Sequence, residues 1–475
     1  MKILFVLNRM AHVRHFDRAI RLLADRGHAI VVASQEDDTQ LREVLADHPA
    51  ITATVAPQRR VDDWAHAASA LRRTRDYVRY LHPRYADALL LRRRAFEKMV
   101  GSVSGREEEV GVEWAELLRA LNKPEQRRLD AILAKLETAV PPDPDVHAFV
   151  AGQNPDLLVL SPMVGVGFSQ ADFVKSARQL GVPSGLLVFS WDNLSNKGLI
   201  HEQPDRIWVW NATQREEAVK LHRYPAEQVV VTGAPRFDAF FDMRPAITRT
   251  ALCHAIGLDA SLPIVTYLCS SRFVAAQEQE FVQRWLAELR QSSDPVLAGC
   301  NVIVRPHPAG VKDWHQDPRT VVRWPTKEKA SASKPFADQR VVVMNSPMQN
   351  ADQVLFDTVH HSAAVVGLNT SAEIEAAIVG RPVYTILDPQ AEGQKGTLHF
   401  HYLLRGQGGH VYLADSFADH GQQLSRALAG DYDAEALGSF LRSFVRPNGI
   451  DRPVSPQVAD AIEALGVRES LPAPR

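Results

Sequence analysis

The chain has 475 residues, 45% of them hydrophobic and 23% charged, and its formal net charge is −2. A single hydrophobic core stops growing at about 250–300 residues, so this length predicts at least two domains. The charge balance gives no reason to expect a nucleic-acid partner. The three cysteines, Cys253, Cys269 and Cys300, fit neither a disulfide framework nor a zinc site. We therefore expect a protein of the reducing cytoplasm.

The N-terminal region alternates between short apolar runs and amphipathic segments. Ile3–Leu7 is predicted to be a buried strand, because an apolar run this short makes neither a signal peptide nor a membrane span. A helix is expected over Phe16–Arg26, Gly27 ends it, and Ile30–Ala33 is the next strand. This alternation is typical of an α/β domain with a parallel sheet, whose ligands bind beyond the carboxyl ends of the strands.

A helical, arginine-rich insertion is predicted from about residue 59 to 140. Residues 59–98 contain eleven Lys or Arg against five Asp or Glu. The simpler interpretation is a solvated helical insertion. The alternative is a surface for an acidic partner or for anionic lipid, with peripheral contact at the inner face of the membrane. Arg92–Arg94 beside Leu89–Leu91 keeps that alternative open.

The strand–helix alternation resumes after Pro141–Pro144. The expected strands are 157–160, 186–189, 207–209 and 229–232, with helices at 171–180 and 214–221. Gly165 and Gly167 match part of a dinucleotide-binding fingerprint, but Gln170 stands at the third glycine position, so a tight turn explains them equally well. We place the first domain at 1–230, the second at 231–430, and a C-terminal helical segment with a loose tail at 431–475.

A second α/β unit is predicted beyond residue 233. Its expected strands are 264–268, 302–304, 341–343, 363–366 and 383–387, with a helix at 281–289. The most informative stretch is AAVVGLNTSAEIEAAIVGRPVYTIL at 363–387, in which a strand is followed by a small polar turn and a helix that ends at Gly380. Free N–H groups and the helix dipole favour an anion at such a turn, and a carboxylate one turn further on can bind a sugar diol. We expect a nucleotide diphosphate there.

Four segments carry a resemblance to a known group of enzymes. They are AHVRH at 11–15 with RGH at 26–28, TGAPRFD at 232–238, RPHP at 305–308, and the stretch 363–387. Together they resemble two-domain nucleotide-sugar glycosyltransferases of the GT-B type. The last two segments are also similar to UDP-N-acetylglucosamine 2-epimerases and to CDP-glycerol glycerophosphotransferase-like proteins. The resemblance implies two facing Rossmann-like domains with the substrate cleft between them.

The resemblance also implies a donor site in the second domain. Arg272 would neutralise the diphosphate leaving group, and Glu375 would bind the ribose hydroxyls, with Glu373 as the fallback. The implied donor-binding residues are Ser270, Ser271, Arg272, Arg305, His307, Asn369, Thr370, Ser371 and Glu375.

The first domain holds the residues that would act on the acceptor. His12 or His15 would take the proton of the acceptor hydroxyl, because a histidine of ordinary pKa serves as a general base near neutral pH. Ala11 replaces the usual glycine and His15 the usual proline, which leaves the choice open, and a positional or capping role is the alternative. Trp191 would stack on a sugar, while Asp192 and Asn193 would bind acceptor hydroxyls or, in the case of Asp192, act as a second base. A self-hydrogen-bonded turn is the alternative for that loop.

The resemblance implies a metal-independent glycosyltransferase. It would move a sugar or a polyol phosphate from a nucleotide-activated donor to a glycan or lipid-linked acceptor in surface glycan synthesis, with no cofactor besides its substrates. No metal site is expected, since no cysteine–histidine cluster is present. One alternative is a 2-epimerase-like isomerase, although the first loop, NRMAHVRH, lacks the Gly-Thr-Arg-Pro opening of those enzymes. The other is a non-catalytic GT-B scaffold.

Overall fold

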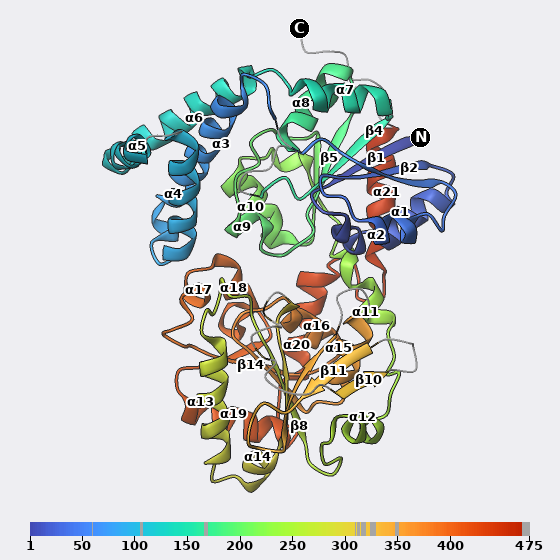
Figure 1. The fold of residues 1–475 in the computed structure, drawn as a ribbon, viewed down its shortest axis with the longest axis vertical. Coiled ribbons are helices and arrows are strands. Elements are labelled where there is room, and N and C mark those ends of the chain that lie inside the picture. Colours follow the sequence, from blue (N-terminus) through green and yellow to red (C-terminus); the bar gives the residue numbers. More distant parts are fainter. Residues whose placement is uncertain are drawn as a thin grey trace. The chain divides into compact units, whose positions relative to one another are not determined.

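The computed structural model describes residues 1–58, 60–104, 108–165, 170–308, 310, 314, 320–323, 329–346 and 351–467. The chain forms two compact units, Met1–Asp238 together with the chain from Arg442 onward, and Ala239–Leu441 (Figure 1). Three features predicted above lie outside the described residues: Arg59, the Val166-Gly167 part of the fingerprint, and the tail after Val467.

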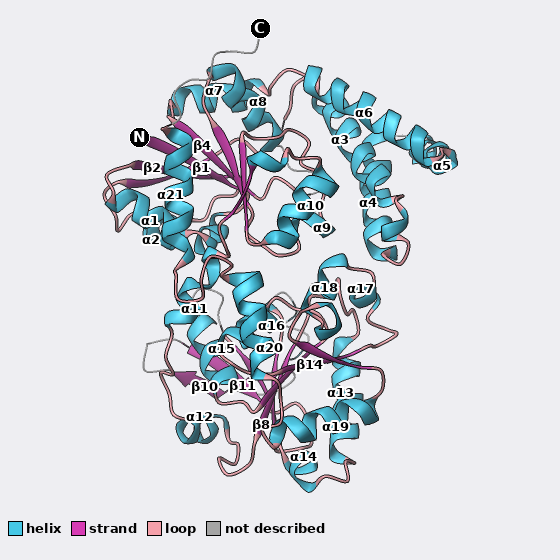
Figure 2. Ribbon diagram, turned by 180° about the vertical axis from the view of Figure 1, so that it is seen from behind, coloured by secondary structure: helices cyan, strands magenta, loops and turns pink. Residues whose placement is uncertain are grey.

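The first unit is built on a seven-stranded parallel sheet in the order β3-β2-β1-β4-β5-β6-β7. Helices cover both faces of this sheet (Figure 2). The strands are β1 (Lys2–Leu7), β2 (Ala29–Ser34), β3 (Ile51–Val55), β4 (Leu157–Ser161), β5 (Ser184–Leu187), β6 (Arg206–Val209) and β7 (Val229–Val231). The flanking helices are α1 (Asp17–Asp25), α2 (Thr39–Leu45), α7 (Pro144–Gln153), α8 (Gln170–Leu180), α9 (Asn193–Asn196) and α10 (Ala212–His222). The direction of strand addition reverses between β1 and β4, which makes their carboxyl ends the switch point of the sheet.

The α/β class predicted from the alternation is confirmed. All the predicted strands of this unit are present, displaced by no more than two residues, because each is a short apolar run and most are buried on both faces. The strand β3 was not predicted. It lies at the edge of the sheet, and in its sequence ITATV only Ile51 is buried, so it lacks the continuous apolar run of the other strands.

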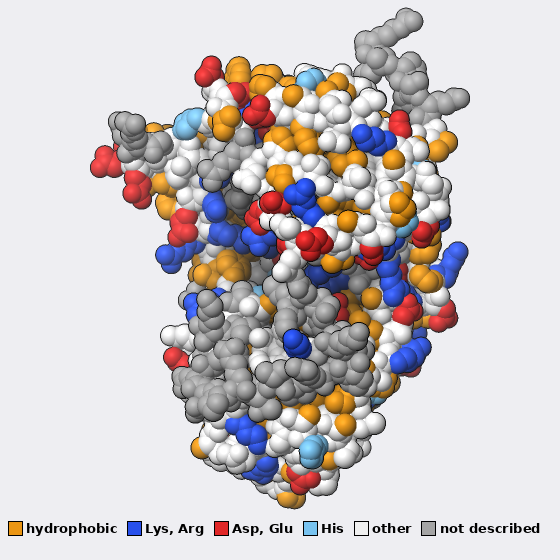
Figure 3. Space-filling view, turned by 45° about the vertical axis from the view of Figure 1, so that its right-hand side comes forward, with side chains coloured by type: hydrophobic (Ala, Val, Ile, Leu, Met, Phe, Trp, Pro, Cys, Tyr) orange, Lys and Arg blue, Asp and Glu red, His pale blue; other side chains and the backbone are white. Residues whose placement is uncertain are grey.

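The helical insertion consists of α3 (Ala65–Tyr80), α4 (Leu89–Val103), α5 (Glu108–Ala120) and α6 (Lys123–Ala139). Several of its arginines lie inside rather than on the surface. Arg72 is buried between Glu137 and Asp172, at 2.8 and 3.1 Å, and Arg75 bonds Asp130 at 2.9 Å. Part of the positive excess counted in the sequence is therefore neutralised within the unit. Other Lys and Arg side chains gather on the surface near the insertion (Figure 3).

The second unit is built on an eight-stranded sheet in the order β10-β11-β12-β9-β8-β13-β14-β15. The strands are β8 (Ile264–Leu268), β9 (Asn301–Arg305), β10 (Thr320–Arg323), β11 (Lys329–Ser333), β12 (Val341–Asn345), β13 (Ala364–Gly367), β14 (Val383–Ile386) and β15 (Val411–Ala414). The described helices are α11 (Asp238–Asp242, which begins at the last residue of the first unit), α12 (Arg249–Ile256), α13 (Glu278–Arg290), α14 (Pro295–Gly299), α15 (Ala351–His360), α16 (Ala372–Ile378), α17 (Glu392–Lys395), α18 (Leu398–Leu403), α19 (Phe417–Leu428) and α20 (Ala434–Phe440).

The switch point of the second sheet lies between β8 and β13. The neighbouring strands β12, β9, β8, β13, β14 and β15 run parallel, whereas β10 and β11 form an antiparallel edge. The sequence predicted the parallel core of this sheet but not β10, β11 or β15.

The chain returns to the first unit at its C-terminal end. The helix α21 (Val454–Gly466) packs its apolar face against α1 (Figure 1). Asp238 fixes the return, because its carboxylate accepts hydrogen bonds from the backbone N–H groups of Val454 and Ser455 and pairs with Arg446 at 2.7 Å. Among the described residues, no helix is long and apolar enough to cross a membrane.

Candidate functional site

The carboxyl ends of β8, β9 and β13 bring distant parts of the second unit together. Leu268 at the end of β8 lies opposite Arg305 of β9 and Gly367 of β13. The N–H of Asn369 donates to the Ser270 hydroxyl at 3.2 Å, across the switch point of the sheet. The structure thus gathers Ser270, Arg305 and Asn369 at the place where sheets of this kind bind ligands.

The stretch that the sequence singled out folds as predicted. The strand β13 is followed by the polar turn, by α16, and then by Gly380 at φ +79°, a left-handed conformation that favours glycine. Gly367 is required by a close approach. A Cβ there would lie 2.8 Å from Glu373 Oε1 and 3.3 Å from the Leu268 carbonyl oxygen.

Glu373 lies beneath this turn and supports it. Its side chain is fully buried, and its Oε1 accepts a hydrogen bond from the Thr370 N–H at 3.2 Å. Burial raises the pKa of Glu373 to about 8, so the carboxyl is mostly protonated at neutral pH. Its Oε1 is therefore engaged in holding the turn. Burial does not separate Glu373 from Glu375, which is only 3% exposed, so the fallback role of Glu373 stays a prediction.

Arg305 and Glu375 are electrostatic neighbours at the same edge. Burial lowers the pKa of Arg305 to about 10, and the charge of Glu375 opposes that shift. Arg305 Nη2 donates to the Ser346 hydroxyl at 2.8 Å, while Nη1 has no hydrogen-bond partner among the described residues. Asn369 Nδ2 donates to Thr397 Oγ1 at 3.0 Å, and Asn369 Oδ1 has no hydrogen-bond partner among the described residues. One buried donor and one buried acceptor therefore remain for a ligand.

A cavity of about 420 Å³ adjoins the ends of β8 and β9. Three predicted donor residues line it: Ser270, Arg272 and His307. Burial lowers the pKa of His307, which keeps its imidazole neutral at pH 7. The cavity does not include the other predicted donor residues. Ser271 accepts backbone hydrogen bonds from Val274 and Ala275 through its carbonyl, and Thr370 and Ser371 stay partly exposed before α16.

Glu278, the first residue of α13, also lines this cavity and was not predicted. Its two carboxyl oxygens accept hydrogen bonds from the Ser270 N–H at 2.9 and 2.8 Å, and Tyr267 donates its hydroxyl to Oε1 at 3.1 Å. Burial raises the pKa of Glu278 to about 7. An acidic residue in the first turn of the helix that follows a switch-point strand is the sequence signal that could have identified it.

In the first unit the two predicted histidines lie on the 3-10 helix Met10–His15, directly after β1. Both imidazoles stack on the ring of Phe189, with centroid distances of 4.8 Å for His12 and 4.9 Å for His15. Phe189 follows β5, so the loops after β1 and β5 meet near the switch point of this sheet. Sequence reasoning missed Phe189 because nothing local to it indicates a ring partner so far away in the chain.

The histidines do not have the ordinary pKa that the sequence interpretation assumed. Burial, followed by the charges of Arg9 and Arg14, lowers the pKa of His12 to about 4. Burial, Arg236 and Arg14 hold the pKa of His15 well below its usual range. Both imidazoles are therefore neutral at pH 7, and the Nδ1 of each has no hydrogen-bond partner in the described part of the chain.

The loop at Trp191-Asp192-Asn193 bonds to itself. The Ser190 N–H donates to Asn193 Oδ1 at 3.2 Å and the Ser190 hydroxyl to Asp192 Oδ1 at 2.7 Å. Lys197 pairs with Asp192 Oδ2 at 3.1 Å. Trp191 is only 4% exposed, which leaves little of its ring for a sugar. This geometry favours the self-bonded turn that the sequence left as the alternative.

No group of three or more His, Cys, Asp or Glu side chains that could hold a metal ion occurs among the residues that the structure describes.

No family model and no curated protein matches this sequence. Solved structures match over nearly the whole chain. A glycosyltransferase from Rickettsia africae matches at 10% identity with a TM-score of 0.53, covering 98% of this chain and 99% of its own. The UDP-GlcNAc 2-epimerase from Methanocaldococcus jannaschii matches at 10% identity and a TM-score of 0.51, covering 98% and 99%.

A third similar structure is the UDP-GlcNAc 2-epimerase from Neisseria meningitidis, which was solved bound to UDP-GlcNAc. It matches at 11% identity and a TM-score of 0.51, covering 98% of this chain and 100% of its own. At such low identity the likeness establishes the fold alone. The chain has the GT-B fold that glycosyltransferases share with UDP-N-acetylglucosamine 2-epimerases.

Proposed function

We propose that this protein is a GT-B enzyme that uses a nucleotide-activated donor, and that it transfers a sugar or a polyol phosphate to a hydroxyl of a glycan or lipid-linked acceptor. The observation that carries the proposal is the switch point of the second sheet. There Arg305 Nη1 and Asn369 Oδ1 are buried without partners among the described residues, beside a cavity of about 420 Å³. Proteins of this fold in the comparisons are glycosyltransferases and nucleotide-sugar epimerases.

On the donor side, we assign the diphosphate to the cavity and the polar turn. Arg272, the hydroxyls of Thr370 and Ser371 and the Ser371 N–H would stabilise the charge that develops on the departing phosphate, since the N–H groups of Asn369 and Thr370 already donate to Ser270 and Glu373. Ser270 and Ser271 would complete this contact, and His307 would donate or accept one hydrogen bond. Arg305 and Glu375 would hold the nucleoside, with Glu375 accepting from the ribose hydroxyls.

On the acceptor side, we assign the base to His12. His12 is partly exposed whereas His15 is buried, so His12 can reach an acceptor while His15 and Phe189 hold its ring. With a sugar donor, the acceptor oxygen bonds to the anomeric carbon, its proton passes to the His12 imidazole, and the nucleoside diphosphate leaves as its bond to that carbon breaks. With a polyol-phosphate donor, the acceptor oxygen bonds to the phosphorus of the polyol phosphate, and the nucleoside monophosphate leaves. Asp192 is the second candidate base, and Trp191 and Asn193 would shape the acceptor site.

An epimerase is the second candidate function, because UDP-GlcNAc 2-epimerases match this chain as well as the glycosyltransferase does. The first loop, Asn8–His15, lacks the Gly-Thr-Arg-Pro opening that marks those enzymes. One assay distinguishes the transferase from the epimerase. Incubation with UDP-GlcNAc alone, in EDTA, leaves the sugar unchanged if the protein is a transferase. Formation of the 2-epimer would contradict the transferase proposal.

The donor site is tested with a panel of nucleoside diphosphates and their sugars or polyol phosphates, scored by thermal stabilisation. We expect one nucleoside to be selected, since a ligand of the native state raises the apparent stability. Glu375→Ala should lose that stabilisation. The matched control is Glu288→Ala, which removes an exposed carboxylate from α13. If no nucleotide stabilises the wild-type protein, the enzyme proposal fails and a non-catalytic scaffold is favoured.

A further inference from the structure

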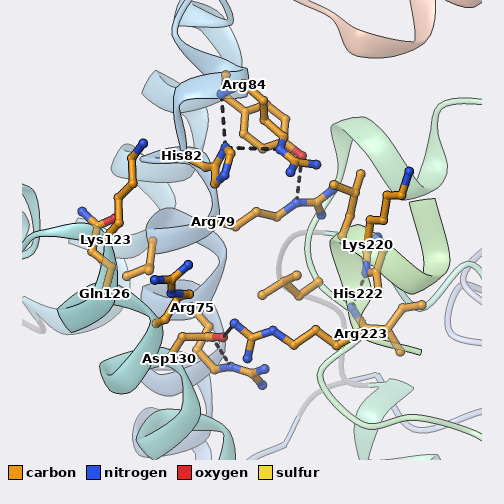
Figure 4. Close-up of a pocket in the computed structure, with 16 residues that line it drawn as sticks. Arg75, Arg79, His82, Arg84, Lys123, Gln126, Asp130, Lys220, His222 and Arg223 are labelled. Carbon is orange, nitrogen blue, oxygen red and sulfur yellow. Dashed lines mark hydrogen bonds and ion pairs between the residues drawn. The ribbon is translucent and has the colours of Figure 1, made fainter. Parts of the chain in front are cut away.

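A second cavity, of about 300 Å³, lies within the first unit where the helical insertion meets α10 (Figure 4). The helices α3 and α6 form one side of it, and the end of α10 with the segment Leu199–Ile200 forms the other. Seven Arg or Lys side chains line it against a single carboxylate, that of Asp130. None of the donor or acceptor residues proposed above lines this cavity.

The inner wall of this cavity holds more positive charge than its one carboxylate can neutralise. Asp130 is buried and shared, because its Oδ1 accepts from Arg75 Nε at 2.9 Å and its Oδ2 pairs with Arg223 Nη2 at 2.8 Å (Figure 4). Arg79 has no carboxylate partner among the described residues. Its guanidinium donates instead to the Tyr85 hydroxyl and to the carbonyl oxygens of Leu194, Ser195, Lys197 and Gly198, and the charge of buried Asp76 acts on it. Arg79 therefore supplies charge to the cavity but no remaining N–H group.

The rim adds three further cations. Arg84, Lys123 and Arg127 are exposed, and the described residues offer none of them a carboxylate partner. The three cations lie close together around His82. Burial and the charges of these three residues lower the pKa of His82. Like charges that converge on one cavity repel one another, and an anion placed among them would relieve that repulsion.

Apolar side chains form the rest of the lining. Val78, Tyr85 and Ile200 are buried beneath the charged groups. This combination suits a group with several oxygens that accept hydrogen bonds from guanidinium forks, attached to a less polar body. A single carboxylate would leave most of the cations without a partner.

We propose that this cavity binds the phosphate or diphosphate group of an organic phosphate. Arg75 and Arg79 provide charge at the inner wall, and Arg84, Lys123 and Arg127 close around the phosphate from the rim. The group could belong to a soluble phosphate ester or to a phospholipid headgroup, which present the same chemistry. This site does not depend on the proposed transferase activity.

The test measures inorganic pyrophosphate binding by calorimetry, with the full-length protein. The variant is Lys123→Ala/Arg127→Ala, which removes two exposed cations of the rim and leaves the ion pairs of Asp130 with Arg75 and Arg223 intact. The matched control is Arg128→Ala/Lys135→Ala, which removes two exposed cations from the same helix, α6, outside the cavity. The measurements are repeated in a second series in which each protein also carries Arg305→Ala. This series separates pyrophosphate binding in this cavity from pyrophosphate binding at the donor site.

We expect pyrophosphate to bind the wild-type protein, the rim variant to bind at least tenfold more weakly, and the control to stay within twofold. The same order is expected in the Arg305→Ala background. Absence of binding at millimolar pyrophosphate, or equal weakening in rim variant and control, would overturn the proposal.

The source of the phosphate is settled by cosedimentation with vesicles of phosphatidylcholine containing phosphatidylglycerol. Vesicle binding that the rim variant loses and the control keeps assigns the site to a lipid headgroup. Pyrophosphate binding without vesicle binding assigns it to a soluble organic phosphate.

Discussion

The switch points of the two sheets differ in their titratable groups, because among the described residues only the second carries acids whose pKa is raised by burial. In the first unit they are bases, and burial lowers the pKa of His12 to about 4 and that of His15 well below its usual range. In the second unit buried acids stand beside Arg305 and His307, and burial raises the pKa of Glu278 to about 7 and that of Glu373 to about 8. In each case burial favours the uncharged form.

The difference lies in what these groups contact. The acids of the second unit accept hydrogen bonds from the loops that follow the strands, Glu278 from Ser270 and Glu373 from Thr370. The histidines of the first unit contact Phe189, and their Nδ1 atoms have no partner among the described residues. Buried acids therefore hold the loops of the second site, whereas the first site has two neutral imidazoles, which the proposed function uses for proton transfer.

The largest effect expected from this comparison is on turnover. His12→Gln should lower the rate of transfer by about 10²–10⁴-fold, the usual contribution of a general base, while nucleotide affinity stays within about twofold. The control is His66→Gln, which changes a histidine of α3 in the same unit. A variant whose nucleotide affinity falls as far as its rate would show that His12 binds ligand instead.

The next effect is on the pH dependence of stability. The pKa of Glu373 rises from 4.5 to about 8 on folding, so its contribution is fully present below pH 4.5 and is lost as the pH rises through 8. Glu373→Gln does not titrate. Relative to wild type, it should therefore gain about 4 kcal/mol of unfolding free energy between pH 5 and pH 9. Urea unfolding at the two pH values measures this, and a difference that stays constant with pH contradicts it.

Local patterns predicted the second site better than the first. The strand–turn–helix–strand at 364–386 was predicted almost to the residue, because Gly380, Pro382 and two apolar runs lie within one short stretch. The same pattern indicated Asn369 and Glu375. It could not indicate Glu278, whose role depends on the path of the loop between β8 and α13.

Contacts between distant segments explain most of what the sequence did not predict. The stacking of His12 on Phe189 joins two loops far apart in the chain, and nothing near either residue specifies the other. The helix α21 is amphipathic, but its sequence does not say that it packs on α1. In the count of arginines at 59–98, Arg72 was not distinguished from an exposed residue, although it is buried and ion-paired. Only the fold shows this difference.

A smaller effect is expected from Arg305, which stands at the donor site. Arg305→Ala should weaken nucleotide binding by about 10- to 100-fold, because hydrogen bonds to charged groups contribute roughly 1.5–3 kcal/mol. Arg426→Ala, which removes an exposed arginine of α19, is the control. Titration calorimetry with the selected nucleoside diphosphate compares the two. Equal affinities in the two variants would remove Arg305 from the donor site.

The smallest effect concerns Phe189, on which both histidines stack. Phe189→Leu should reduce the unfolding free energy by about 1 kcal/mol, the usual contribution of a stacked pair of rings. It should also raise the pKa of His12 from about 4 toward 6.5, because burial is the largest cause of the lowered pKa and the smaller side chain admits water.

The imidazole C–H resonances, followed by NMR as the pH falls, measure that shift, and His12→Gln assigns the signal. The dependence of stability on pH has the opposite sign for His12 and for Glu373. The stability contributed by neutral His12 is fully present above pH 6.5 and is lost as the pH falls through 4, so the Phe189→Leu variant should lose less of it on acidification. An unchanged pKa would mean that Arg9 and Arg14, rather than burial against Phe189, keep His12 neutral. The first site would then be tuned by charge, and the contrast between its buried bases and the buried acids of the second unit would no longer rest on burial alone.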